Sequence, residues 1–395
     1  MESNLSLDLS LIPRELRLIL EIMKSEKDDS KVLLKNELIK DINWDLFLKL
    51  TIHHRVYPFI YSKLNNIDGK SIPSYIVNKL HQEYKKNTFQ MLHLSAEMEL
   101  ISKLFTENHI RVLFLKGPVI ASYAYGDISL RTSKDLDILI PINKLEKVEE
   151  LLLNFGYKRD DEATILNELK WRGYHVSYFH PEKNIQLEVH WRLQPRPSKE
   201  PSFNELWVNK RVSTISTYPV YFLGKEDLFL YLVSHGARHG WFRLRWLLDI
   251  DQILRKESDL DKTKLLLEKY QSCHLGGQAI ILASQLLKTP INDEMAKLIA
   301  KSRSEKLAQK AILFIKEIAP LHIISSTNYY KCYLFSLKPS YLQMFIYIML
   351  LIYPSSTDAN TLRLPKPLHF LYFPLRPFLL VWRKKNKPVY KKSDF

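Results

Sequence analysis

Cysteine is scarce in this sequence, where Cys273 and Cys332 are the only two. Two cysteines cannot form a disulfide framework or a cysteine metal cluster, which predicts a reduced, cytoplasmic setting. Glycine is scarce too, with ten residues among 395, which excludes a chain made mostly of tight turns. The abundance of Leu, Ile, Lys and Glu instead favours a mostly helical protein.

Long apolar runs are also missing. The longest one, Met344–Tyr353 with its immediate flanks, is shorter than the roughly 20 residues that a membrane-spanning helix needs. The N-terminal residues lack the basic start and unbroken apolar stretch of a signal peptide. The sequence therefore predicts a soluble protein whose only contact with a membrane is at the surface.

Negative charge is in deficit, since the formal net charge is +15. This excess permits binding to nucleic acid, anionic lipid or nucleotide phosphates without choosing among them. It is concentrated at the end of the chain, where Arg383 begins a basic stretch that contains Asp394 as its only acid. Two interpretations stay open for this stretch: a solvated tail or contact with an anionic membrane surface.

The hydrophobic pattern divides the chain into four parts. Helical spacing dominates residues 1–109 and 224–325, while 326–395 form an aromatic, basic tail. Between the helical regions, 110–223 contain short apolar runs separated by turn residues, and the loop 180–184 joins the last two as a hairpin. We therefore predict an α+β fold, with a small mixed sheet flanked by helical N- and C-terminal regions.

Two aspartates share one face of a predicted strand. In the segment DLDILIP, side chains alternate across the strand, so Asp135 and Asp137 lie on one side and Leu136, Ile138 and Ile140 on the core side. Adjacent carboxylates repel each other, and a divalent cation is the usual way to offset that repulsion. The alternative is an exposed edge with two solvated aspartates.

A third acid strengthens the case for a metal site. In IQLEVHWRL the apolar residues Leu187, Val189 and Trp191 alternate with Glu188 and His190. If this strand neighbours the first, Glu188 joins the two aspartates, and His190 borders the site without binding metal. Three carboxylates can hold two Mg²⁺ ions that bridge triphosphate oxygens.

Residues before the acids can contact phosphate. Lys116 and Gly117 end a predicted strand just before a helix that begins at Pro118, where free N–H groups favour an anion. Arg131 lies four residues before Asp135 and could reach phosphate oxygens bidentately. The alternatives are a plain helix-starting turn and a solvated loop arginine.

Together these motifs resemble a known family. The segment FLKGPVIASYAYGDISLRTSKDLDILIP, followed by IQLEVHWRL, is similar to the bacterial uncharacterised nucleotidyltransferases of the polymerase-beta-type superfamily. The flanks WDLFLKLTIHHRVYPFIYSKL, HGARHGWFRLRWLLDIDQIL and LPKPLHFLYFPLRPFLL resemble that family's helical lead-in, C-terminal helices and tail. The resemblance covers most of residues 40–382.

The resemblance implies an activity and roles for individual residues. It makes Asp135, Asp137 and Glu188 the catalytic, metal-binding acids. Lys116 and Gly117 stand where the superfamily has a Gly-Ser pair, and Ser133 lies one place before the serine position that Lys134 occupies. The implied reaction transfers a nucleoside monophosphate, or a related group, from a nucleoside triphosphate (NTP) to a hydroxyl of a small-molecule or peptide acceptor, with Mg²⁺ or Mn²⁺ as cofactor.

A second cluster lies on predicted helices after residue 224. His235 and His239 are four residues apart on one helix face, but the Glu of a zinc protease motif is absent between them. We predict that these helices line the cleft and contact the base or the acceptor. The residues concerned are His190, His235, His239, Arg243, Arg245 and Asp249. The alternative is ordinary helix packing.

A different class of function stays open at this point. The basic charge and aromatic tail fit a non-enzymatic protein that keeps the fold and binds nucleic acid or a membrane surface. Paired acids argue against this alternative, because without metal they would repel phosphate.

Overall fold

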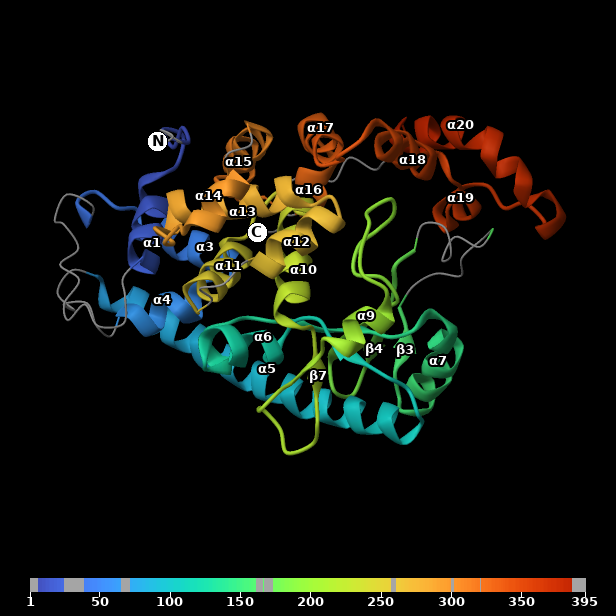
Figure 1. Cartoon of the computed structure of the whole chain (residues 1–395), viewed down its shortest axis with the longest axis horizontal. Coiled ribbons are helices and arrows are strands. Elements are labelled where there is room, and N and C mark those ends of the chain that lie inside the picture. Colours follow the sequence, from blue (N-terminus) through green and yellow to red (C-terminus); the bar gives the residue numbers. More distant parts are fainter. Residues whose placement is uncertain are drawn as a thin grey trace.

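The structure, a computed structural model, describes residues 6–24, 39–64, 72–160, 166, 173–256, 261–299, 302–319 and 321–385. The basic residues after Lys385, which belong to the predicted tail, therefore lie outside the described part of the chain. Figure 1 shows the long helix α5 (Ser74–Glu107) along one side of the molecule, with the C-terminal helices on the opposite side and the sheet region between. This arrangement confirms the predicted α+β fold with helical flanks.

A seven-stranded mixed sheet forms the centre of the fold, in the order β3-β4-β5-β2-β1-β7-β6. The strands are β1 (Leu113–Phe114), β2 (Asp135–Leu139), β3 (Lys158–Arg159), β4 (His175–His180), β5 (Ile185–His190), β6 (Arg211–Val212) and β7 (Tyr221–Phe222). The hairpin β4–β5 is antiparallel as predicted, whereas β5 runs parallel to β2. The short strands β3, β6 and β7 were not predicted, because two residues carry too little hydrophobic periodicity.

The register of β2 and β5 follows from their apolar faces. Leu136 pairs with Leu187 and Ile138 with Val189, and all four side chains are fully buried. Side chains alternate along a strand, so a slip of one residue would send this whole apolar set to the polar face. Burial of these four residues thus fixes which residues stand on the other face.

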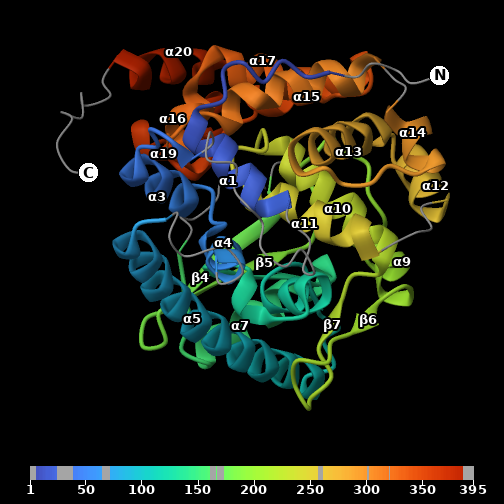
Figure 2. The same cartoon turned by 90° about the vertical axis from the view of Figure 1, so that its left-hand side faces the viewer.

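Helices come before, within and after this sheet in the chain, and α5 packs on β2 and α7 on β3. The N-terminal region has α1 (Arg14–Lys24), α3 (Trp44–His53), α4 (Tyr57–Leu64) and α5; α7 (Leu145–Asn154) and α9 (Phe203–Val208) lie within the sheet region. The helices after the sheet are α10 (Lys225–Arg238), α11 (Leu244–Lys256), α12 (Asp261–Lys269), α13 (Cys273–Leu287), α14 (Asp293–Ile299) and α15 (Ser302–Ile315). Figure 2 shows α1 beside α13, so the two helical regions contact each other although they are far apart in sequence.

The last helices are α16 (Leu321–Ser326), α17 (Asn328–Ser336), α18 (Tyr341–Ile352), α19 (Ser356–Thr361) and α20 (Tyr372–Lys385). Pro374 and Pro377 predict a break in any helix here, but α20 runs through both. Pro374 lies in its first turn, where the missing N–H has no helical partner to lose. No helix in the described ranges is long and apolar enough to cross a membrane.

Candidate active site

The structure places the three predicted acids on two adjacent strands, β2 and β5. Asp137 is directly opposite Glu188 on the neighbouring strand, and Asp135 stands two residues earlier on β2. Nε2 of His190 lies 3.3 Å from Oδ1 of Asp137 and 3.3 Å from Oε2 of Glu188, so these two carboxylates share a face of the sheet. His190 borders the acids as the sequence predicts.

Asp137 is the most buried of the acids, at 1% exposure, and it has a built-in counter-ion. Nζ of Lys116 lies 2.9 Å from its Oδ1. Burial opposes charge on Asp137, but Lys116 and His190 outweigh it and hold the pKa of this carboxyl well below its usual range. For Lys116, burial is likewise outweighed by Asp137 and the pKa of the ammonium is raised. Both groups are therefore charged at neutral pH.

The remaining acids are less constrained. Burial and the nearby Asp137 raise the pKa of Asp135. For Glu188, burial is outweighed by His190, and its pKa is lowered. Within the described ranges the carboxylate of Asp135 has no ion pair or hydrogen bond, and Oδ2 of Asp137 is buried without a hydrogen-bond partner. Buried polar oxygens are nearly always satisfied, so these oxygens suit a cationic ligand.

A second ligand set overlaps the acids. Among the described residues, one group of three metal-ligating side chains has atoms within 4.8 Å of one another, and it consists of His175, Glu188 and His190. His175 on β4 was not singled out from the sequence, although it faces His190 across the hairpin, with the rings stacked at 4.9 Å. Imidazole ligands suit transition metals, whereas carboxylate oxygens suit Mg²⁺ and Mn²⁺.

The Lys116–Gly117 turn positions the start of β2. Gly117 has φ +81°, a conformation that residues with a Cβ rarely adopt, and Oγ of Ser133 donates a 3.1 Å hydrogen bond to the carbonyl of Asp135. The helix expected after it is short: α6 (Pro118–Ile120) continues as a π-helix (Ala121–Tyr125). A turn of this length adds little helix dipole, so the expected anion-binding advantage of a helix N-terminus is weak here.

Arg131 is placed differently from the sequence expectation. Its side chain is 1% exposed, and its Nε and Nη2 donate to the two carboxylate oxygens of Asp249 at 2.8 and 2.9 Å. Tyr125 donates a further hydrogen bond to Asp249 at 2.8 Å. These contacts occupy the edge of the guanidinium that bidentate phosphate binding would use. In this structure Arg131 and Asp249 join α11 to the segment before β2, and their direct contact with substrate stays an untested prediction.

Two other arginines approach the same segment. Nη1 of Arg245 donates to the carbonyl oxygen of Thr132 and, at 3.3 Å, to its Oγ1. Nη1 of Arg243 donates to the carbonyl of His53, the last residue of α3 before the turn to α4. The next residues of that turn include Arg55, which the sequence analysis did not select. The sequence gives little indication of a functional role for Arg55, which is a single cation between two histidines and a strongly apolar stretch.

His235 and His239 lie inside an aromatic cluster. Their rings are 4.6 Å apart, and each packs on Trp246 at 5.3 and 5.1 Å. Burial, together with the positive charges of Lys116 and Arg238, lowers the pKa of both imidazoles well below the usual value. Both are therefore neutral at pH 7, and their predicted contact with base or acceptor remains untested.

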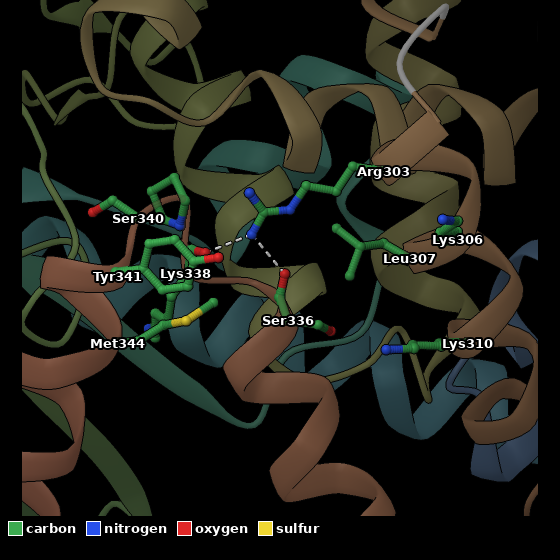
Figure 3. A pocket seen from close by; sticks show the side chains of 10 residues that line it. Arg303, Lys306, Leu307, Lys310, Ser336, Lys338, Ser340, Tyr341 and Met344 are labelled. Atoms are coloured by element: carbon green, nitrogen blue, oxygen red, sulfur yellow. Dashed lines mark hydrogen bonds between the residues drawn. The ribbon is translucent and has the colours of Figure 1, made fainter.

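A separate cavity of about 410 Å³ lies between α15 and the start of α18. Figure 3 shows Arg303 in this cavity, donating to the carbonyls of Ser336 and Lys338, with Lys306 and Lys310 nearby on the same helix. None of the predicted site residues lines it. This basic cavity is therefore distinct from the acid cluster.

Comparison with known proteins agrees with the geometry. Residues 40–288 match the model of a family described as uncharacterised nucleotidyltransferases. The chain belongs to this family. The nucleotidyltransferase match spans the lead-in helices, the acids and the helices through α13, so the protein is an enzyme whose acceptor is not identified.

Two further comparisons add little to the assignment of this chain to the nucleotidyltransferase family. A search of curated proteins finds no match. A solution structure of the antibiotic-resistance factor ANT(2'')-Ia is similar at 11% identity, covering 47% of this chain and 93% of that one, with a TM-score of 0.34. A similarity of that size carries no argument about substrate or mechanism.

Proposed function

We propose that this nucleotidyltransferase is metal-dependent, belongs to the polymerase-beta-type superfamily, and transfers a nucleoside monophosphate from an NTP to a hydroxyl of a small-molecule or peptide acceptor. The observation that carries the proposal is the pairing of Asp137 with Glu188 on adjacent strands, with Asp135 beside them. Oδ2 of the buried Asp137 has no hydrogen-bond partner among the described residues, so it suits a cationic ligand.

The donor set fits a divalent cation. Asp135, Asp137 and Glu188 would hold Mg²⁺ or Mn²⁺, since both are bound through carboxylate oxygens. The bound ion would offset charge on the triphosphate and lower the pKa of the attacking hydroxyl. Lys116 keeps Asp137 ionised in its buried position, and His190 holds the carboxylates of Asp137 and Glu188 toward each other.

The test is transfer from labelled NTPs. The full chain is incubated with each of the four α-labelled NTPs in Mg²⁺ or in Mn²⁺, together with a mixture of hydroxyl-bearing small molecules and peptides. We expect metal-dependent label in a product that EDTA prevents. If no NTP yields product under any of these conditions while the protein is folded, the proposed transfer is wrong.

We further propose that the C-terminal helices make peripheral contact with an anionic membrane surface. Figure 1 shows α18, α19 and α20 at one end of the molecule. Large apolar side chains are exposed on both long helices, including Tyr341 and Phe345 on α18 and Phe378 and Trp382 on α20. Exposed apolar residues interspersed with exposed cations such as Arg363 and Lys366 suit the interface of an anionic bilayer.

Vesicle sedimentation tests this contact. We expect the protein to sediment with vesicles that contain phosphatidylserine and to be released by 1 M salt, because surface attraction is screened. Replacing both Phe378 and Trp382 by Ser should abolish sedimentation. Protein that resists both salt and carbonate extraction would contradict a peripheral mode, and equal sedimentation with neutral vesicles would contradict the electrostatic part.

A further inference from the structure

A turn from the N-terminal region docks onto the entrance of the acid-bearing strand. At the α3–α4 turn, the carbonyl of His53 accepts a hydrogen bond from Arg243. His54 accepts from the backbone N–H of Leu244 through Nδ1 at 3.3 Å and from that of Arg245 through its carbonyl at 3.2 Å. These contacts place Arg55, the next residue of the turn, beside the start of α11.

The same junction reaches the residues just before Asp135. Arg245 is 7% exposed and donates through Nη1 to Thr132, three residues before that aspartate. Its Nε is buried and has no hydrogen-bond partner among the residues that the structure describes. An unsatisfied donor on a buried guanidinium needs an acceptor, and a phosphate oxygen of a bound ligand would supply one.

Four cations gather here without carboxylate partners. Arg55, Lys134, Arg243 and Arg245 form no ion pair within the described ranges. Burial and then Arg55 lower the pKa of Arg243 to about 10, and burial and then Arg131 and Arg55 lower that of Arg245 to about 9. At pH 7 Arg243 and Arg245 still carry charge. Arg55, followed by burial and Arg243, lowers the pKa of Lys134, so the members of the cluster repel one another.

Backbone conformation fixes the position of Arg55 at the end of α3. Arg55 has φ +56°, the left-handed conformation in which many helices end. Hydrogen bonds on both sides keep it there, from its own N–H to Ile52 at 3.0 Å and from Val56 to Thr51 at 3.2 Å. The turn thereby presents an arginine toward Asp135, with which it interacts electrostatically.

We propose that Arg55, Lys134, Arg243 and Arg245 form the polyphosphate site of this enzyme and bind the triphosphate of the NTP next to Asp135. This inference rests on the proposed function and names the residues that hold its donor substrate. Planar arginine forks match phosphate oxygens bidentately, and the unpaired charges of the cluster are neutralised by the ligand.

The proposal replaces part of the sequence-based assignment. Lys116 is engaged with Asp137 and Arg131 with Asp249, so neither cation is available unless its carboxylate is given up. By contrast, Lys134 is exposed and Arg243 is half-buried, which leaves them accessible to a ligand. The phosphate site is thus drawn from three separate segments of the chain.

Calorimetry with inorganic tripolyphosphate in EDTA tests the cluster without metal or transfer. We expect Arg55→Gln, Lys134→Gln and Arg243→Gln each to weaken binding by about tenfold, the size of one lost charge-assisted contact. Lys306→Gln and Lys310→Gln, which remove the same charge from the basic cavity of Figure 3, should change affinity less than about twofold, as screened charges do.

The outcomes separate this inference from the proposed function. Loss of tripolyphosphate binding in the cluster variants but not in the cavity variants supports the site even if no transfer is ever detected. Equal losses in both sets would mean general attraction to a basic protein and would overturn it. So would detectable transfer with an unchanged KM for NTP in Arg55→Gln and Lys134→Gln. Thermal melts of each variant identify any that fail to fold, and Lys134→Gln, at an exposed position, keeps the test valid.

Discussion

Replacing Asp135 by Asn is expected to lower the rate of nucleoside monophosphate transfer by at least about 10³-fold while leaving the protein as stable as before. Loss of a metal ligand removes several kcal/mol of charge stabilisation in the transition state, and each 1.36 kcal/mol is tenfold in rate. Stability is spared because the Asp135 carboxylate has no ion pair or hydrogen bond in the described structure. Single-turnover transfer and a urea unfolding curve measure the two effects.

The control for this variant is Glu182→Gln. Glu182 is an exposed acid in the loop of the β4–β5 hairpin, so the change removes one negative charge near the same strands and should leave turnover intact. Asp137→Asn is a poorer probe, because it leaves the buried ammonium of Lys116 without its counter-ion. Turnover of Asp135→Asn equal to that of Glu182→Gln would contradict the metal assignment.

Replacing Arg131 by Met is expected to lower the free energy of unfolding by about 3–5 kcal/mol, because it leaves the buried carboxylate of Asp249 without its counter-ion. Both partners are almost completely shielded from solvent, so water cannot solvate the carboxylate of Asp249 in place of the lost guanidinium. Urea denaturation monitored by circular dichroism measures the loss. If Arg131 instead served mainly to bind phosphate, NTP affinity would fall and stability would not.

Two further variants calibrate this experiment. Arg159→Met breaks an ion pair with Glu149 that is partly exposed on both sides, and such pairs contribute about 0–1 kcal/mol. The double change Arg131→Met with Asp249→Leu should recover most of the lost stability, because a hydrophobic pair can replace a buried ion pair. A loss for Arg131→Met no larger than that for Arg159→Met would show that the pair is not structural.

The acid-bearing strands could be predicted because two local rules determine them. Alternation in DLDILIP and IQLEVHWRL assigns each side chain to a face, and burial of Leu136 and Leu187 leaves a single register that satisfies both strands. The parallel pairing of β5 with β2 then brings Asp137 and Glu188 together, and this pairing was an assumption that the local rules could not supply. Their role in binding metal is a separate, chemical inference from this placement.

The partners of the cations could not be predicted in this way. Whether Arg131 contacts phosphate or Asp249 depends on how α11 packs against a loop 118 residues earlier in the chain, and no local pattern encodes that packing. Arg55 was missed for a similar reason, since its position next to Asp135 results from hydrogen bonds between two turns. Charge identifies a cation, whereas only tertiary structure decides what it faces.

The ion pair between Lys116 and Asp137 has a consequence for the order of assembly. Many metalloproteins need their ion to fold, because the ligands otherwise repel one another. Here the deepest carboxylate is already neutralised by an ammonium that belongs to the chain, so the apoprotein has no need of metal for its architecture. A divalent ion bound as proposed would then be able to arrive and leave together with the nucleotide, without being a permanent part of the scaffold.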